Sequence, residues 1–392
     1  MTESDVILPG ATLGLFGGGQ LGRMFALAAQ RMGYRVHLFA PRGDTPAAAV
    51  CDQFTEADYD DLDAVAAFAS SVAAITLEFE NIPAATVDAA ASHAPVRPGR
   101  EVLATAQNRL REKRFLRDIG CGTAAFAAIT SDDDLAAAIA EVGLPAVIKT
   151  AAWGYDGKGQ RYVESADELR EAWASMSRGG RASVGGASVD EAILEAWIDL
   201  DCEVSVVAAR SPDGSIVCFP PSRNDHANHI LDVSVSPAGL PDALTAEATD
   251  AARQIVGRLG VVGVLCVEFF VTAGGELLVN ELAPRPHNSG HLTINGHAVS
   301  QFEQQVRSVC GLPLGDPIPL RPAAMANLLG ELWDGGEPDW AAALAIPGVS
   351  LHLYGKAEPR TGRKMGHLTA IADTIDAARA NVLAARAALG GA

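Results

Sequence analysis

Two short hydrophobic runs, residues 264–270 and 276–281, flank a loop at 272–275 that contains a Gly-Gly pair. This pattern predicts an antiparallel β-hairpin. If the two glycines form the centre of a two-residue turn, Glu268 lies directly opposite Glu281 on one face of the sheet. If all four loop residues leave the ladder, the register moves by two, and both carboxylates stay on that face as diagonal neighbours.

Like charges placed so closely repel each other and favour a cation between them. Carboxylate oxygens without Cys or His partners suit Mg²⁺, which takes one or two protein carboxylates and fills its other positions with water and substrate phosphates. We therefore predict Glu268 and Glu281 as metal ligands and Mg²⁺ with a nucleoside phosphate as their occupant. The alternative is a pair of solvated glutamates at a strand end, since edge strands often carry charge.

The size and charge of the chain limit what it can do. Its 392 residues predict two or three domains. Its net charge of −18 opposes general affinity for nucleic acid or for an anionic membrane, so neither is an expected partner. The six cysteines form no C-x-x-C pair, the N-terminus lacks the features of a signal peptide, and no 18-residue apolar run occurs. We expect a cytoplasmic protein in a reducing compartment.

The first hundred residues alternate short apolar runs with alanine-rich segments. Strands are expected at 11–16, 34–39 and 73–79, with helices between them, which predicts an open parallel α/β domain. A helix over 107–119 then carries a cluster of basic residues that is unusual in this acidic chain.

A second, α+β unit is expected to follow. It contains a helix at 132–141 and strands at 146–149 and 160–163. Strands at 192–195 and 203–207 are then expected to open a larger sheet that includes the hairpin, and a helix starts near residue 374. The predicted fold class is therefore α/β combined with α+β.

Residues 17–22 follow a strand and fit the pattern G-x-G-x-x-G. Glycines here allow a tight turn and let backbone amides at a helix N-terminus approach an anion, either a dinucleotide or the phosphate of a small substrate. The acid that would bind the ribose of a dinucleotide is missing, because Phe39, Ala40 and Pro41 stand at that position. A dinucleotide-dependent oxidoreductase therefore remains only as an alternative.

The loop 154–160 contains three glycines and Lys158 between two expected strands. It is not a Walker A loop, because G-x-x-x-x-G-K-[ST] occurs nowhere in the chain. A glycine-rich hairpin loop can fold over phosphate oxygens with its backbone amides, while Lys158 and Lys149 supply positive charge. The alternative is an ordinary surface turn.

The run 280–291 packs unusual polar density beside the hairpin. Arg285 offers a rigid fork for a carboxylate-like anion, and Asn288 can donate hydrogen bonds to one. Zinc bound by His287 and His291 is the alternative, but the prolines and glycine in this run argue against the helix that would align them. A second basic cluster, Lys356 with residues 360–367, is expected to anchor a substrate phosphate; its alternative is a solvated turn.

These strings, in this order, resemble the ATP-grasp superfamily and, within it, the 5-(carboxyamino)imidazole ribonucleotide synthases of purine biosynthesis. The matching strings are residues 18–24, 78–82, 154–160, 280–291 and 362–367, so the resemblance covers nearly the whole chain. It implies an ATP-grasp fold with an N-terminal pre-ATP-grasp domain (1–115), a small lid subdomain (116–200), a core with the metal site (201–325) and a C-terminal closing subdomain (326–392). It also implies a homodimeric ligase that uses ATP, bicarbonate and aminoimidazole ribonucleotide, with Mg²⁺ as cofactor and carboxyphosphate as intermediate.

The resemblance also implies residue roles. ATP is expected at Arg109, Lys149, Gly154, Tyr155, Asp156, Gly157, Lys158, Gly159, Gln160, Glu195, Ala196, Trp197, Ile198, Glu203, His226, Asn280 and Glu281. The ribonucleotide is expected at Gln20, Leu21, Glu78, Tyr155, Lys356, Arg363 and Lys364, and Mg²⁺ at Glu268 and Glu281. The catalytic residues implied are Arg285, His287, Asn288 and Lys356, the first three holding bicarbonate and its activated form. The polar segment 220–226 departs from the family pattern, so the role of His226 has the least support.

Three other functions stay open on the sequence alone. One is another ATP-grasp ligase, such as a formate-dependent glycinamide ribonucleotide transformylase. The others are the oxidoreductase named above and a nucleotide-binding regulator without turnover.

Overall fold

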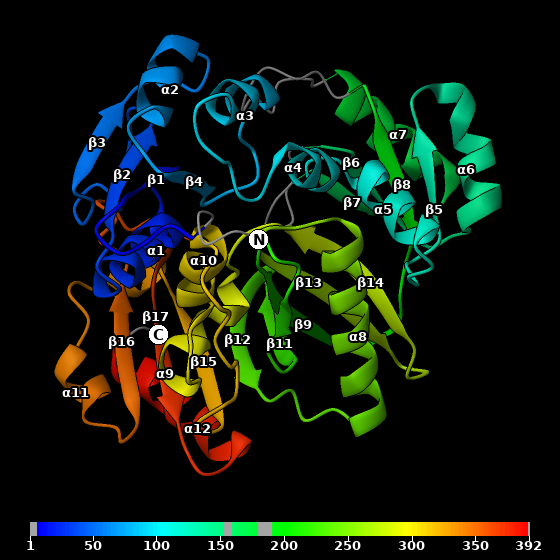
Figure 1. The fold of residues 1–392 in the computed structure, drawn as a ribbon. Coiled ribbons are helices and arrows are strands. Elements are labelled where there is room, and N and C mark those ends of the chain that lie inside the picture. The colour runs from blue at the N-terminus through cyan, green and yellow to red at the C-terminus, as the bar shows by residue number, and fades with distance from the viewer. Residues whose placement is uncertain (1–5, 153–158, 179–189, 391–392) are drawn as a thin grey trace.

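The computed structural model describes residues 6–152, 159–178 and 190–390, and these form three sheets (Figure 1). The N-terminal sheet has the order β3-β2-β1-β4, and its neighbouring strands pair in parallel. Its strands are β1 Thr12–Phe16, β2 Arg35–Ala40, β3 Gln53–Glu56 and β4 Ala74–Leu77, and its helices are α1 Gln20–Arg31, α2 Leu62–Ala69 and α3 Ala84–Ala91. The expected parallel α/β domain is confirmed. The strand β3 was not predicted, because its short sequence is polar and lies exposed at the sheet edge.

A small antiparallel sheet follows, with the order β5-β8-β6-β7. Its elements are β5 Phe126–Ile129, α6 Leu135–Val142, β6 Ala146–Thr150, β7 Gln160–Val163, α7 Ala166–Arg178 and β8 Ala192–Ala196, reached through α4 Arg100–Ala106 and α5 Arg109–Asp118. Buried apolar residues of α6 and α7 join those of the strands in one core. The strand expected at 192–195 therefore belongs to this sheet rather than to the larger one.

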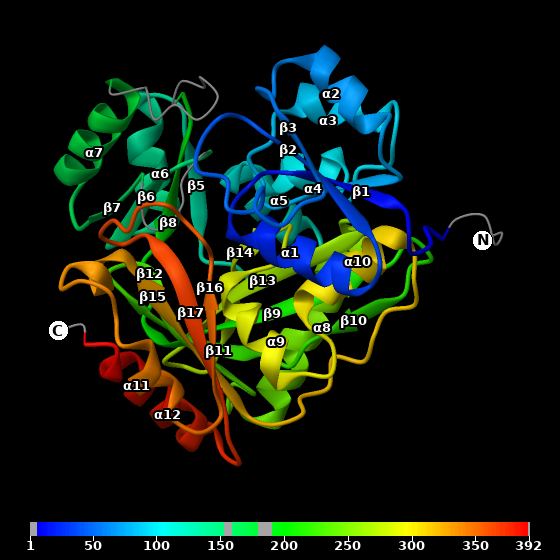
Figure 2. The same ribbon diagram turned by 90° about the vertical axis from the view of Figure 1, so that its left-hand side faces the viewer.

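The largest sheet has nine strands in the order β14-β13-β9-β11-β12-β15-β17-β16, with β10 added to β9. Its strands are β9 Leu200–Arg210, β10 Ile216–Cys218, β11 Ser222–Ala227, β12 Ile230–Ser236, β13 Gly263–Thr272, β14 Leu277–Ala283, β15 Ala323–Leu329, β16 Val349–Leu353 and β17 Lys364–Ile371. The helices of this region are α8 Asp242–Arg258, α9 Thr293–Gly296, α10 Gln301–Cys310, α11 Trp340–Leu344 and α12 Ile375–Ala388. Figure 2 shows α11 and α12 beside the C-terminal strands. The expected boundary between residues 325 and 326 lies inside β15, and the domain limits stay predictions.

The predicted hairpin is β13–β14, and Glu268 pairs with Glu281 as expected. The route to this register differs from the two-residue turn. Thr272 and Glu276 close a three-residue loop, which by itself would place Glu268 opposite Asn280. A β-bulge then adds Asn280 to β14 and brings Glu281 opposite Glu268. Two offsets of one residue cancel, and both carboxylates share a face.

The helix α10 joins the N-terminal sheet to the rest of the molecule through buried polar side chains. Gln305 Nε2 donates to Thr76 Oγ1 at 3.0 Å and to the Leu77 carbonyl at 3.3 Å, at the end of β4. Glu303 accepts from Arg31 of α1, the helix beside which α10 lies in Figure 2. Buried polar groups with partners fix relative position more sharply than apolar contact does. The end of β4 is thereby held against α10.

Two further observations concern the whole chain. All six cysteines are free thiols. Across the described ranges, the structure contains no helix with the length and hydropathy needed to cross a membrane.

Candidate active site

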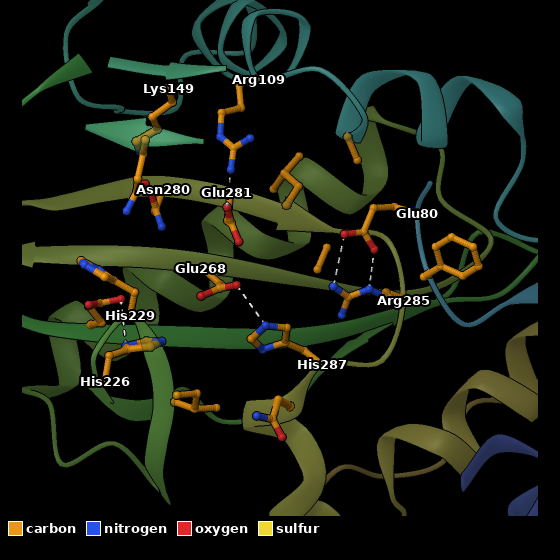
Figure 3. A pocket seen from close by; sticks show the side chains of 18 of the residues that line it. Glu80, Arg109, Lys149, His226, His229, Glu268, Asn280, Glu281, Arg285 and His287 are labelled. Carbon is orange, nitrogen blue, oxygen red and sulfur yellow. Dashed lines mark hydrogen bonds and ion pairs between the residues drawn. The ribbon is translucent and has the colours of Figure 1, made fainter. Parts of the chain in front are cut away.

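One cavity of about 1330 Å³ gathers residues of the small and the largest sheets together with residues of α1 and of the segment after β4 (Figure 3). This volume exceeds that of an ordinary one-ligand pocket, so it has room for a nucleotide and a second substrate. Among the candidates from the sequence it is lined by Gln20, Leu21, Glu78, Arg109, Lys149, Gln160, Glu195, Ala196, Trp197, Ile198, Glu203, His226, Glu268, Asn280, Glu281, Arg285, His287, Asn288, Lys356, Arg363 and Lys364. Gly159 is not one of the lining residues, and Gly154, Tyr155, Asp156, Gly157 and Lys158 lie outside the described residues.

The carboxylates of Glu268 and Glu281 differ in how closely a positive group approaches them. His287 Nε2 lies 3.0 Å from Glu268 Oε1, whereas Arg109 Nη2 lies 3.9 Å from Glu281 Oε2 (Figure 3). Burial raises the pKa of Glu268, but the charge and hydrogen bond of His287, together with the charge of His226, outweigh it and bring that pKa to about 2. Burial and then the neighbouring Glu268 raise the pKa of Glu281 above its ordinary value. Negative charge at Glu281 is therefore poorly balanced by the protein alone.

The donor set around this pair fits Mg²⁺. Two carboxylates are present, with Asn280 beside them, and no group of three or more His, Cys, Asp or Glu side chains arranged for a metal occurs in the described ranges. Mg²⁺ needs few protein ligands because it keeps waters and substrate phosphates. The zinc alternative has little support, since His287 bonds Ser289 and approaches Glu268, while His291 Nδ1 bonds Gln301.

A buried charge cluster lies where the nucleotide phosphates were expected. Lys149 Nζ donates to Glu195 Oε2 at 2.8 Å, and Lys113 Nζ lies 4.0 Å from the same oxygen. Burial raises the pKa of Glu195, but Lys113 and Lys149 outweigh it and lower that pKa to about 2. The Glu195 carboxylate thus holds Lys149 in an ion pair as well as lining the cavity. Lys113 was not predicted as a site residue.

The region expected to hold the nucleoside combines an aromatic edge with an acid. Trp197 is 55% exposed and packs edge-on against Tyr162, with ring centroids 4.9 Å apart. Glu203 Oε2 lies 3.3 Å from His226 Nδ1. Burial lowers the pKa of His226, but Glu203 outweighs it and raises that pKa overall. His226 is thereby held against Glu203 at the cavity wall.

Arg285 forms a two-point contact with Glu80 that sequence reasoning missed. Its Nε lies 2.5 Å from Glu80 Oε2 and its Nη2 lies 3.3 Å from Oε1, as the dashed lines in Figure 3 show. Burial raises the pKa of Glu80, but Arg285 outweighs it and lowers that pKa. The Nε–Nη2 edge of the guanidinium is therefore occupied. Nη1 donates to the Pro286 carbonyl at 3.2 Å, which leaves its second N–H for an anion. The sequence signal for Glu80 as a site residue was its place in the matching string 78–82.

The segment after Arg285 is held by a buried glutamine. Gln301 Oε1 accepts from the His287 backbone N–H at 2.9 Å, and Gln301 Nε2 donates to the His287 carbonyl at 2.7 Å. Next to it, both polar atoms of the Asn288 side chain are buried without a partner in the described part of the chain. An unpaired buried amide is costly, so a ligand that pairs with Asn288 would gain from it.

The opposite end of the cavity is basic, yet its arginine is already paired. Arg363 Nη2 lies 2.5 Å from Asp44 Oδ2, and Arg363 Nη1 donates to the Glu358 carbonyl at 2.7 Å. Lys356 Nζ sits over the Tyr354 ring, 5.7 Å from its centroid. Burial and then the charge of Arg363 lower the pKa of Lys356 to about 8. Asp44 was not expected in the site.

The glycine turn already has a partner within the protein. Its amides donate to a carboxylate of the protein itself, with Gly19 N 2.5 Å from Glu78 Oε1 and Gly22 N 3.0 Å from Oε2. A Cβ atom at Gly17 would lie 2.3 Å from Glu78 Cγ, so the glycines make room for this side chain. Glu78 thus accepts from two of the amides that could have bound a substrate phosphate, which argues against that alternative. Gln20 and Leu21 line the cavity from the same turn.

Three family profiles match successive parts of the chain. Residues 10–107 match the ribonucleotide synthetase preATP-grasp domain, and residues 114–302 match the ATP-grasp domain. Residues 323–381 match the phosphoribosylaminoimidazole carboxylase C-terminal domain. The order of these domains is the one expected from the sequence.

Curated relatives point the same way. The chain is 42% identical over 367 residues to N5-carboxyaminoimidazole ribonucleotide synthase of Bacillus subtilis, covering 94% of this chain and 93% of the relative. It is 41% identical over 371 residues to the enzyme of that name from Brucella melitensis, covering 94% and 98%. Against the bifunctional purine synthesis protein purC/E of Dictyostelium discoideum it is 40% identical, but it spans only 37% of that protein. Any second activity of the longer protein is therefore not carried over.

Solved structures agree with the fold. A crystal structure of the ADP complex of purK, an N5-carboxyaminoimidazole ribonucleotide synthetase, has a TM-score of 0.89 and 40% identity, covering 97% of this chain and 98% of that one. The Aspergillus clavatus N5-carboxyaminoimidazole synthase, solved with ADP and 5-aminoimidazole ribonucleotide, has a TM-score of 0.84 and 28% identity, covering 97% and 98%. The resemblance and the ATP-grasp fold predicted from the sequence are thereby confirmed. The chain belongs to the N5-carboxyaminoimidazole ribonucleotide synthase family of ATP-grasp ligases.

Proposed function

We propose that the cavity carries out the ATP-dependent carboxylation of 5-aminoimidazole ribonucleotide to N5-carboxyaminoimidazole ribonucleotide, with bicarbonate as the carbon source. Family membership supports the ligase reaction and its place in purine biosynthesis. The observation that carries the proposal is the single cavity, which has converging carboxylates at one end, a basic cluster at the other, and Arg285, His287 and Asn288 between them. ATP bound at one end and the ribonucleotide bound at the other would both reach bicarbonate between them.

The nucleotide is placed at the acidic end. Arg109, Lys149 and Gln160 line the part of the cavity next to the hairpin and supply positive charge and an amide for the phosphates. Residues 196–198 offer an exposed aromatic edge and backbone groups for adenine, and Glu203 offers a carboxylate for the ribose. Lys149 lies 2.8 Å from Glu195, so it must leave or share this carboxylate to reach a phosphate. The flexible side chain of lysine permits this movement.

Glu268 and Glu281 would hold Mg²⁺, with Asn280 next to them. When bound there, Mg²⁺ supplies charge neutralisation for the phosphoryl group in transfer. The chain's own contribution is to place both carboxylates on one face of the sheet and to hold His287 against Glu268.

Bicarbonate is placed beside the Nη1 edge of Arg285, with Asn288 and His287 completing its binding site. Transfer of the terminal phosphoryl group of ATP to bicarbonate gives carboxyphosphate, which water would destroy. The amine of the ribonucleotide attacks the activated carbon, a C–N bond forms, and the C–O bond to phosphate breaks. The pairing of Arg285 with Glu80 holds the guanidinium in place for this reaction.

The phosphate of the ribonucleotide is placed at Arg363, Lys364 and Lys356, with Gln20, Leu21 and Glu78 on the other side of the substrate. Because Arg363 is held by Asp44, binding exchanges a carboxylate for a phosphate. We further propose that the protein is cytoplasmic and forms a homodimer. Sedimentation of the purified protein tests the homodimer.

The test is a steady-state assay of ADP formation with ATP, bicarbonate and aminoimidazole ribonucleotide each omitted in turn. We expect ADP formation to require all three. ATP consumption that ignores the ribonucleotide would refute the proposal, and support by formate in place of bicarbonate would favour the formate-dependent enzyme. ATP binding without turnover would indicate a regulator.

A further inference from the structure

The edge strand β14, which carries Asn280 and Glu281, is held along its outer side by residues of α5 and the segment after it. Lys113 Nζ donates to the Val279 carbonyl at 3.1 Å, and Glu112 Oε2 accepts from the Leu282 backbone N–H at 3.0 Å. The Val279 N–H donates to the Gly122 carbonyl at 2.8 Å. Backbone groups on both sides of the bulge are thus bonded away from β13.

The bond of Leu282 to Glu112 fits only the bulged form of the strand when Val279 is also bonded outward. In a regular strand the edge to which backbone groups point alternates, so residues 279 and 281 would share the outer edge while Leu282 would face β13. The extra residue at Asn280 changes this alternation and turns the Leu282 N–H outward, where Glu112 accepts it. Lys113 holds Val279 and Glu112 holds Leu282 on the same outer edge, and the two contacts together require the extra residue between these positions.

The two side chains are built into the interior. Glu112 is 2% exposed and Lys113 is 1% exposed. Burial raises the pKa of Glu112 to about 8 and lowers the pKa of Lys113, and the charge of each partly opposes the shift of the other. Lys113 also lies 4.0 Å from Glu195 of the small sheet, which fixes Lys149. The first residue of the same helix, Arg109, lies 3.9 Å from Glu281. One helix therefore links the hairpin carboxylate to both cations expected at the nucleotide phosphates.

We infer that Glu112 and Lys113 are positioning residues that hold the β-bulge at Asn280 and thereby point Glu281 toward Glu268 and the metal-nucleotide. Loss of the bulge would shift the register by one residue and move Glu281 to the other face of the sheet. The role of the pair in binding rests on the proposed function. The role of the pair in holding the strand does not.

The test compares three variants in the full chain. Glu112→Gln keeps an oxygen that can accept from Leu282, whereas Glu112→Leu removes it at similar volume. Glu303→Leu is the matched control, since Glu303 is also buried and paired with arginine but lies on α10, away from β14. The readouts are amide hydrogen exchange over residues 279–283 in the ligand-free protein, the affinity for Mg²⁺·ADP by calorimetry, and the ribonucleotide KM.

We expect Glu112→Leu to raise exchange at Leu282 and to weaken Mg²⁺·ADP binding by about 10- to 100-fold, the usual effect of losing an outer partner of a ligand. The ribonucleotide KM should change by less than about threefold, and Glu112→Gln should keep both protection and affinity. Glu303→Leu should lower thermal stability without changing either. Unchanged exchange and affinity in Glu112→Leu, or lost protection at Leu282 in Glu112→Gln, would overturn the inference.

Glu112→Leu removes one of the carboxylates that balance the buried Lys113 and leaves Glu195, 4.0 Å away, to do so; a poorly balanced buried charge lowers stability. The double variant Glu112→Leu/Lys113→Met removes both charges and keeps the interior apolar. It should fold and show fast exchange at residues 279–283; full protection there would also overturn the inference. Hydrogen exchange needs no turnover, so it decides this point even if the wild-type protein fails the ADP assay.

Discussion

The two ends of the cavity handle charge in opposite ways. At the hairpin end, Glu281 faces Glu268 across the sheet, and its best cation, Arg109, is 3.9 Å away. At the ribonucleotide end, the anion-binding groups already hold carboxylates of the protein: Arg363 pairs with Asp44, and the glycine-turn amides pair with Glu78. At the hairpin end the Glu281 carboxylate lacks a close cation, whereas at the other end Arg363 and the glycine-turn amides are already paired with carboxylates.

This difference predicts different binding behaviour. A ligand that brings a cation relieves repulsion at the hairpin end, so metal and nucleotide should bind together there. A phosphate at the other end must displace or share an internal carboxylate, so its affinity depends on the competition between them. Variants at the two ends should therefore affect different substrates. Loss of a carboxylate should weaken binding at the hairpin end and strengthen it at the other end.

The largest effect should come from Glu281→Gln at the hairpin end. We expect kcat to fall by at least about 10²-fold because a metal ligand is lost, and removal of a repelled charge should leave thermal stability unchanged or raised. Steady-state kinetics and a thermal melt measure the two. Near-normal turnover with the wild-type Mg²⁺ dependence would remove Glu281 from the metal site and abolish the contrast between the ends.

Arg363→Ala should act on the other end alone. Loss of a charge-assisted bond to phosphate is worth about 1.5–3 kcal/mol, so the ribonucleotide KM should rise by about 10- to 100-fold. The KM for ATP should stay nearly constant, because Arg363 is placed away from the nucleotide. Equal increases in both constants would contradict the division of the cavity.

The pH dependence of ribonucleotide use should follow Lys356. Its pKa is lowered to about 8, so in the free enzyme it is charged below that pH and neutral above it. We expect kcat/KM for the ribonucleotide to fall as pH rises through about 8, approaching tenfold per pH unit if the charge is essential. The profile of Lys356→Arg should stay flat to higher pH, because arginine keeps its charge. A wild-type profile that is flat to pH 10 would contradict this role.

The smallest predicted effect has the opposite sign. Asp44→Asn removes the carboxylate that competes for Arg363, so the ribonucleotide KM should decrease, by up to about fivefold for a partly exposed pair. The matched variant Asp232→Asn removes a similar partner of Arg386 outside the cavity and should leave this constant unchanged. An increase in KM for Asp44→Asn would show that Asp44 orients Arg363 rather than competing for it.

The sequence predicted the shared face of the two glutamates, because strand side chains alternate with a fixed period. It could not show that a three-residue loop and a bulge at Asn280 would cancel, since bulges depend on what the strand edge meets. The groups that meet it, Glu112 and Lys113, lie about 170 residues away in the chain. They look like ordinary charges of a helix in the sequence.

The other misses have the same origin. The glycine turn was correctly placed between strand and helix, but its occupant, Glu78, comes from another strand end. The contacts of Glu80 with Arg285 and of Asp44 with Arg363 also join distant segments. Local patterns predicted the elements and the cavity-lining strings, whereas partners across the chain needed the fold. Five predicted loop residues, 154–158, lie outside the described ranges, and their roles stay predictions.

The most direct test is a crystal structure with a nonhydrolysable ATP analogue and Mn²⁺ in place of Mg²⁺, located by its anomalous signal. We expect the metal within about 2.0–2.3 Å of oxygens from both Glu268 and Glu281 and from the nucleotide phosphates. A metal-nucleotide bound elsewhere, or one approached by neither carboxylate, would contradict the central claim that the bulged hairpin forms the metal site.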